Sequence, residues 1–291
     1  MGKIIEFIGS PGSGKSELSN IAVNYLSKSG FKVLDRLTSQ FFGFKKWLSS
    51  VKRVKYQTQK DILEFFLNIM PQKIGRRVVD STLFIDIYDY KKYLINNFTI
   101  KNPILIDFTK NRLEEVFNSN KRNYRKTRFL AGFKENYAQY QNAEELMENE
   151  IVVLDEAALN KLLMIHSPIN VDEIPPDYQK YINQFIDYLS PIIDYNFFVY
   201  TDPKLCIERQ KSRRSVMRGW KKIMGIDDIN DKNILKELER RVKDYQIIHE
   251  TLLENGVKSF KIDNNGSLED AKEQLYPCLD EIIEDLEEAD D

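Results

Sequence analysis

Cysteine and histidine are scarce in this chain, which has two of each among its 291 residues. Cys206 and Cys278 have no metal-ligand spacing, and such sparse cysteine predicts reduced thiols. His166 and His249 lie far apart and have no cysteine neighbours, which argues against a zinc site and against a histidine general base. The residues that carry any chemistry are therefore expected to be lysine, arginine, aspartate and glutamate.

Long apolar runs are also missing, and none approaches the ~20 residues that a membrane-spanning helix requires. The first expected strand begins almost at once, which leaves no space for a signal segment. At 42% hydrophobic residues, the chain can still bury one large core of helices and strands. We therefore expect a cytoplasmic protein with one domain over residues 1–291 and no membrane partner.

One eight-residue run matches the phosphate-binding pattern G-x-x-x-x-G-K-[ST] at every fixed position. Its glycines let the backbone curl so that successive N–H groups point at phosphate oxygens, and the following helix adds its positive end. The run predicts a nucleotide-binding site whose cofactor is ATP. It consists of Gly9, Ser10, Pro11, Gly12, Ser13, Gly14, Lys15 and Ser16.

The residues around this run fit the same interpretation. The apolar segment Ile4 to Ile8 predicts a buried parallel strand before it, and helical spacing of apolar residues follows it as far as Gly30. Lys15 is expected to reach the terminal phosphates. Ser16 is expected to place its hydroxyl on Mg²⁺, which stays bound mainly to phosphate oxygens and water.

A second apolar segment, Ile151 to Leu154, predicts a strand that ends in Asp155 and Glu156. In proteins with this type of phosphate loop, an acidic residue at the tip of the neighbouring strand holds Mg²⁺, usually through water. An adjacent carboxylate can orient or deprotonate the nucleophile. We therefore expect a metal or catalytic role for Asp155 and a catalytic role for Glu156.

Three more strands are expected, at 32–34, 196–200 and 258–262. The first ends at Asp35 and Arg36, where the carboxyl ends of the strands face the ligand, so this charged pair is either a substrate contact or a surface turn. The last is followed by a turn in which Asn264 is expected to border the nucleotide base.

Residues 39–150 form a long helical insert between strands, and this insert is expected to arch over the crevice and supply the acceptor pocket. It carries a basic cluster with interleaved aromatic residues, which is either a solvated helix face or a contact for an anionic substrate. The cluster consists of Lys121, Arg122, Arg125, Lys126 and Arg128.

Charge is unevenly distributed near the C-terminal end. The segment 204–222 is strongly basic, and its spaced guanidinium groups suit a mobile lid that clamps a triphosphate. A nucleic-acid patch and a merely solvated basic helix are the alternatives. The acidic segment 280–291 is expected to be the solvated face of a last helix. The candidate catalytic arginines of the lid are Arg209, Arg213, Arg214 and Arg218.

The loop, the strand ends at 35–36 and 155–156, and the Asp202-Pro203 helix occur in the order found in nucleoside and nucleotide kinases. The chain resembles a divergent thymidylate kinase-like protein. This resemblance implies an α/β three-layer sandwich with a five-stranded parallel sheet in order 2-3-1-4-5, ATP on the phosphate loop, and an arginine-bearing lid. In deoxynucleoside kinases a carboxylate contacts the acceptor hydroxyl, and the resemblance makes Asp35 its counterpart and a candidate base.

Two departures from the family leave the acceptor open. Where thymidylate kinases usually carry Asp-Arg-aromatic and Arg-Glu-Pro motifs, this chain has Asp155-Glu156-Ala157 and Arg36-Leu37-Thr38. The sequence predicts an ATP- and Mg²⁺-dependent phosphotransferase acting on a small acceptor, a nucleoside or nucleoside monophosphate. The alternatives are a nucleic-acid-associated ATPase or polynucleotide kinase, and a module that senses ATP without turnover. A homodimer is one possible assembly.

Overall fold

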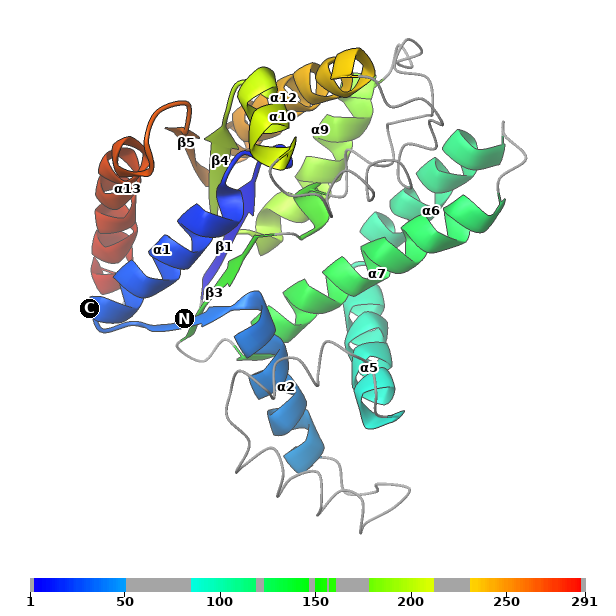
Figure 1. Cartoon of the computed structure of the whole chain (residues 1–291). Coiled ribbons are helices and arrows are strands. Elements are labelled where there is room, and N and C mark those ends of the chain that lie inside the picture. The colour runs from blue at the N-terminus through cyan, green and yellow to red at the C-terminus, as the bar shows by residue number, and fades with distance from the viewer. Residues whose placement is uncertain are drawn as a thin grey trace.

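The computed structural model describes residues 3–50, 85–118, 123–146, 150–155, 157–160, 178–211 and 231–288. Its centre is a five-stranded, all-parallel sheet in the order β2-β3-β1-β4-β5 (Figure 1). This confirms the fold class and the strand order that the sequence resemblance implied. The strands are β1 (Lys3–Ile8), β2 (Lys32–Asp35), β3 (Glu150–Leu154), β4 (Tyr195–Tyr200) and β5 (Lys258–Asp263).

The central strand β1 shows why these apolar runs form a parallel sheet. Ile5 and Phe7 are buried on one face, and Ile4 and Ile8 are buried on the other. A strand covered by helices on both faces needs apolar residues at successive positions, because neither face meets water. Glu6 is the exception, since this acid is fully buried within the strand.

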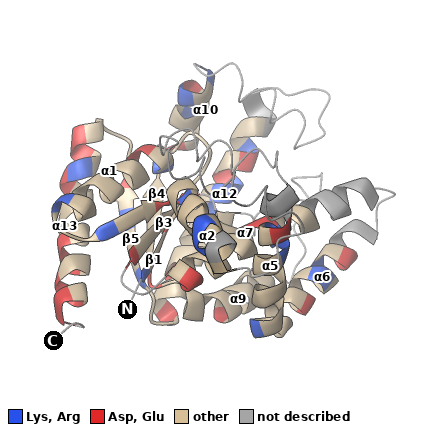
Figure 2. Ribbon diagram, turned by 90° about the horizontal axis from the view of Figure 1, so that it is seen from below, with Lys and Arg blue, Asp and Glu red and all other residues tan. Residues whose placement is uncertain are grey.

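Two helices cover one face of the sheet, α1 (Lys15–Lys28) and α13 (Leu268–Glu288) (Figure 1). α1 buries Leu18, Ala22 and Leu26 at helical spacing, and Gly30, with a positive φ, directly follows its C-cap Ser29, close to the end that the sequence predicted. α13 buries one apolar stripe, and its acidic residues lie along the outer surface (Figure 2). The acidic segment is thus the solvated face of a helix up to Glu288, where the described part ends.

The opposite face is covered by α7 (Asn123–Leu146), α9 (Tyr178–Leu189) and α12 (Asp231–Glu254), with α6 (Pro103–Asn118) packed against α7 and α9. A short 3-10 turn, η1 (Ser190–Ile192), leads into β4. Together with α1 and α13 these helices make three layers, helix, sheet and helix, around two apolar cores.

The expected helical insert contains α2 (Arg36–Ser50), α5 (Ile85–Lys101), α6 and α7. α2 begins at Arg36, three residues earlier than the expected insert boundary, because Asp35 caps its first turn. α2, α5 and α7 enclose a separate aromatic cluster around Phe44, Trp47 and Tyr90. Within the described part of the chain, no helix is both long and apolar enough to cross a bilayer.

Candidate functional site

The phosphate loop joins the end of β1 to the first turn of α1. Gly12 and Gly14 have φ angles of 89° and 88°, which L-residues with a side chain rarely adopt. The N–H of Ser13 donates to the carbonyl of Ser10 at 3.0 Å, and Gly14 is the N-cap of α1 without a side-chain cap. The first turn of the helix therefore directs backbone N–H groups outward, which is the arrangement that binds phosphate.

Side chains from distant parts of the chain donate hydrogen bonds to the backbone carbonyls of this loop. Thr201 Oγ1 donates to the Ser13 carbonyl at 3.1 Å, and Asn264 Nδ2 donates to the same oxygen at 2.7 Å. Gln210 Nε2, from α10 (Pro203–Lys211), donates to the Pro11 carbonyl. Asn264 thus supports the loop backbone, and its expected contact with a nucleotide base stays a prediction. No motif in the sequence signalled Thr201 or Gln210.

We expect Gly14→Ala to weaken ATP binding at the phosphate loop, and Gly30→Ala is its matched control. Both glycines have positive φ, 88° and 97°, so alanine adds backbone strain of about 1–2 kcal/mol at either position. A Cβ on Gly14 would lie 2.4 Å from Asn264 Nδ2, whereas a Cβ on Gly30 would meet nothing within 4 Å. Only Gly14→Ala should therefore weaken ATP binding, by about tenfold or more if one supporting hydrogen bond is lost.

The measurements are thermal unfolding and ATP titration of both variants. The expected outcome is a loss of stability in both variants, larger in Gly14→Ala, with weaker ATP binding in Gly14→Ala alone. ATP binding that is unchanged in Gly14→Ala would show that Asn264 does not set the loop conformation.

Asp35 and Asp155 lie at the ends of the neighbouring strands β2 and β3, and both line one cleft of about 240 Å³. Asp35 Oδ1 accepts the N–H of Thr38 at 2.7 Å and its hydroxyl at 2.8 Å, so this carboxylate caps α2. Arg36 Nε lies 3.9 Å from Asp155 Oδ1. The structure thus brings together the two carboxylates that the sequence placed at strand ends. The lining residues are Ser19, Asn20, Val23, Asp35, Arg36, Leu37, Val153 and Asp155.

Arg36 lines both this cleft and a second pocket, which lies between α2, α5 and α7. Gln139, which lines this pocket, is 6% exposed, and its Oε1 has no hydrogen-bond partner. Nδ2 of the buried Asn136, one turn earlier in α7, also has no partner. The pocket has a volume of about 70 Å³ and combines apolar side chains of α5 and α7 with polar and charged ones. It is lined by Arg36, Gln40, Tyr90, Lys91, Leu94, Ile95, Glu135, Ala138 and Gln139.

Two cations that the sequence predicted for the site, Lys15 and Arg209, act on the buried thiol of Cys206. Burial raises the pKa of the Cys206 thiol to about 11, and the nearby charges of Arg209 and Lys15 act in the opposite direction. Helix α10, which carries Arg209, contacts the loop directly, since its Gln210 donates to the Pro11 carbonyl. Several predicted site residues lie outside the described part of the chain, namely Glu156, His166, Arg213, Arg214 and Arg218. The side chains of the basic cluster at 121–128 are likewise not described.

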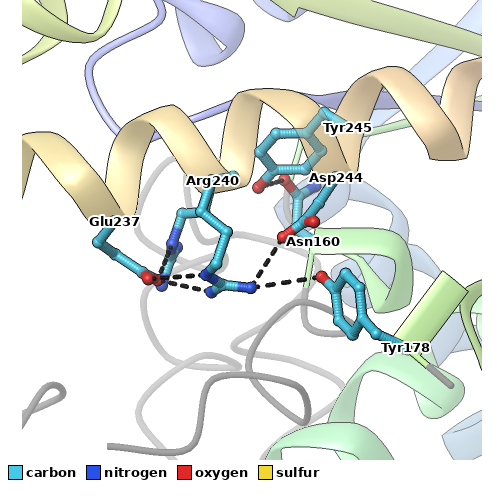
Figure 3. A network of polar contacts seen from close by, with 7 residues as sticks. Asn160, Tyr178, Glu237, Arg240, Asp244 and Tyr245 are labelled. Carbon is cyan, nitrogen blue, oxygen red and sulfur yellow. Dashed lines mark hydrogen bonds and ion pairs between the residues drawn. The ribbon is translucent and has the colours of Figure 1, made fainter. Parts of the chain in front are cut away.

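A buried ionic network lies on α12, which follows the expected lid in the chain (Figure 3). Glu237 accepts hydrogen bonds from Arg240 at 3.0 Å and from Arg241 at 2.7 Å. Arg240 also donates to Asp244 at 2.9 Å and to the Tyr178 hydroxyl at 3.3 Å, where α9 begins. Removing one partner from such a buried network costs about 3–5 kcal/mol. The network therefore fixes α12 against the start of α9.

Tyr245 of α12 and strand β1 both form hydrogen bonds with Asn160, in the segment after β3. The Tyr245 hydroxyl donates to Asn160 Oδ1 at 3.1 Å (Figure 3). Asn160 Nδ2 donates in turn to the Phe7 carbonyl at 3.1 Å. Asn160 lies five residues after Asp155. Helix α12 and strand β1 thus both anchor the segment that follows the candidate metal ligand.

No protein-family model matches the sequence, and no curated protein matches it significantly. Among solved structures, deoxyadenosine kinase from M. mycoides with bound dATP is similar over 96% of this chain and 98% of that chain, at 14% identity and a TM-score of 0.43. The same enzyme with bound dCTP is similar over 97% and 99%, at 14% identity and a TM-score of 0.40. Identities and TM-scores of this size assign no function to the chain.

Proposed function

We propose that the protein is a P-loop phosphotransferase that transfers the terminal phosphoryl group of ATP to a nucleoside or a nucleoside monophosphate. One observation carries this proposal: Asp35 and Asp155 line one cleft beside α1, the helix that begins at Lys15 of the phosphate loop. Phosphoryl transfer needs little covalent chemistry from the protein, and it depends on positioning and on neutralising charge. A phosphate cradle next to a pair of carboxylates and several cations supplies both.

The residues at the loop fit a nucleoside triphosphate with Mg²⁺. Glycines stand where a Cβ would collide with the loop's own supports, which leaves the backbone free to approach phosphate oxygens. Ser16 in the first turn of α1 and Asp155 at the end of β3 would hold the magnesium ion, and its charge offsets that of the phosphates. Lys15 and Arg209 would stabilise the charge on the transferred group.

Asp35 is our candidate for the base that accepts the acceptor's hydroxyl proton. Its Oδ1 is engaged with Thr38, so its geometry is fixed by the first turn of α2. The neighbouring pocket beyond Arg36, with a volume of about 70 Å³, would receive one edge of the acceptor between the apolar side chains of Tyr90, Leu94 and Ile95. Gln40 and Gln139 line this pocket and would supply polar contacts to a nucleobase. Thymidylate specificity is a narrower form of this proposal.

The test is an acceptor panel with purified protein, Mg²⁺ and ATP, in which ADP release and phosphorylated product are followed together. The panel contains nucleosides, nucleoside monophosphates, sugars and short oligonucleotides. We expect ADP release that depends on a nucleoside or a nucleoside monophosphate. Turnover with oligonucleotides alone would indicate a polynucleotide kinase, and ATP binding without turnover on any acceptor would indicate a sensor module.

A further inference from the structure

A row of polar side chains crosses the face of the sheet that α7 and α12 cover. Glu6 on β1 pairs in register with Asn196 on β4, and Asn196 pairs with Ser259 on β5. Side chains of residues paired in this way leave the same face of neighbouring strands, about 4.8 Å apart. Glu6 and Asn196 are fully buried, and Ser259 is 8% exposed. An acid, an amide and a hydroxyl therefore lie side by side within the core.

One end of this row reaches α12. Asn196 Nδ2 donates to Ser259 Oγ at 2.7 Å. Ser259 Oγ lies in turn 2.7 Å from Nδ1 of His249, which is 8% exposed. Because Asn196 already donates to this hydroxyl oxygen, the Ser259 proton is available for a neutral His249 ring to accept.

The other end reaches the candidate site. The hydroxyl of Tyr140, on α7, donates to Glu6 Oε2 at 2.5 Å. The same hydroxyl oxygen accepts the backbone N–H of Ala158 at 3.1 Å. Ala158 lies three residues after Asp155, and Tyr140 directly follows Gln139 of the acceptor pocket. The row is thus joined both to the segment that carries the candidate metal ligand and to a wall of the acceptor pocket.

The row has one gap in the middle. Glu6 Oε1 and Asn196 Oδ1 are both buried, and neither has a hydrogen-bond partner. If Glu6 were ionised, the backbone N–H groups of Leu159 and Ala157 would favour its charge, but Asn196 Oδ1 on the neighbouring strand would still lack a donor in the core, which is unfavourable. A single proton on Glu6 Oε1 supplies a donor where Asn196 lacks one, and so satisfies both atoms.

We propose that Glu6 is a neutral carboxylic acid whose Oε1–H donates to Asn196 Oδ1, and that through Tyr140 it positions the segment carrying Asp155. Every donor in the row then points in the same direction, from the Ala158 N–H through Tyr140, Glu6, Asn196 and Ser259 to His249 Nδ1. The positioning role rests on the proposed function, whereas the protonation state does not. Glu6 touches no substrate in this proposal and acts only through Tyr140.

The titration behaviour of the groups along the row agrees with this assignment. Burial raises the pKa of the Glu6 carboxyl to about 8, although the Tyr140 hydroxyl and the backbone N–H groups of Leu159 and Ala157 favour its ionised form. Burial also raises the pKa of Tyr140 well above its ordinary value. The pKa of His249 is lowered by burial and by the charge of Lys261, while Glu250 acts in the opposite direction. Glu6 is therefore the member of the row that titrates just above neutral pH.

Two variants of Glu6 test the proposal without any acceptor. Glu6→Gln can accept from Tyr140 and donate to Asn196, as a neutral acid does, whereas Glu6→Leu fills similar space and makes neither hydrogen bond. At pH 7 the infrared difference spectrum of wild type minus Glu6→Gln should contain the carbonyl band of a neutral carboxylic acid. The Ala158 amide should exchange its hydrogen about tenfold faster in Glu6→Leu than in Glu6→Gln.

Turnover provides the readout of the positioning role. The kcat of the wild type should fall as Glu6 loses its proton near pH 8, and Glu6→Gln should keep its kcat across this range. Lack of the carboxylic acid band, or the same alkaline decline in both proteins, would overturn the proposal. If the wild type turns over no acceptor on the panel, the proposed function fails, and the infrared band and Ala158 exchange still decide the state of Glu6.

Discussion

Replacing Lys15 by alanine is expected to lower kcat by about 10³-fold, since one preorganised charge at a transferring phosphoryl group is worth roughly that much. Lys15 is the first residue of α1 and is not part of the apolar stripe that packs on the sheet. Its loss should therefore leave the core intact. The measurements are kcat with the acceptor identified by the panel and the thermal unfolding temperature.

Lys28→Ala is the matched control for this variant, because Lys28 lies in the last turn of the same helix and is exposed. We expect its kcat to equal that of the wild type. An unchanged kcat in Lys15→Ala would remove the phosphate loop from the mechanism. A lowered unfolding temperature in that variant would instead assign the loss to the fold.

The variant Asp35→Asn is expected to lower kcat by about 10²–10⁴-fold, which is the usual contribution of a positioned general base. Asparagine keeps an oxygen that can accept the N–H and hydroxyl of Thr38, so the cap of α2 survives while the basic carboxylate is lost. The affinity for ATP should not change. Steady-state kinetics with the acceptor, together with an ATP titration, separates the two effects.

Thr38→Val tests the cap independently, since it removes the hydroxyl bond to Asp35 and keeps the backbone one. A small change in kcat is expected for this variant. If Asp35→Asn keeps wild-type turnover while Asp155→Asn or Glu156→Gln loses it, the base is one of the other two carboxylates. That result would leave Asp35 as a structural cap.

The parts of the site that could be predicted from the sequence are those whose signals are local. The phosphate loop has all its fixed positions within eight residues, and Asp35 and Asp155 each follow directly after a short apolar strand. Parallel strands bring their carboxyl ends to one edge, so adjacent strands were enough to place both carboxylates in one cleft. Their catalytic and metal-binding roles stay predictions.

The start of α2 could also have been predicted more closely. Asp35 is followed three residues later by Thr38, and an aspartate that accepts the N–H of the third following residue is a common helix N-cap. The strand and the helix share this residue. The strand-end signal and the helix-cap signal therefore coincide at Asp35.

The supports of the site could not be predicted, because they come from distant positions without a motif. Thr201 and Asn264 both reach the Ser13 carbonyl, and Tyr140 reaches Glu6. A threonine, an asparagine or a tyrosine has no local pattern that indicates such a contact. The neutral state of Glu6 depends likewise on burial and on strand register, which appear only in three dimensions.

The strand order also has a consequence for how the chain folds. β1 lies at the centre of the sheet, yet Thr201 and Asn264, which hold its phosphate loop, lie 188 and 251 positions away from Ser13. Contacts between residues so far apart form slowly, because the entropy of closing a long loop is lost before the contact is made. We therefore expect the loop with the clearest local signature to reach its final shape late, after β4 and β5 have joined the sheet.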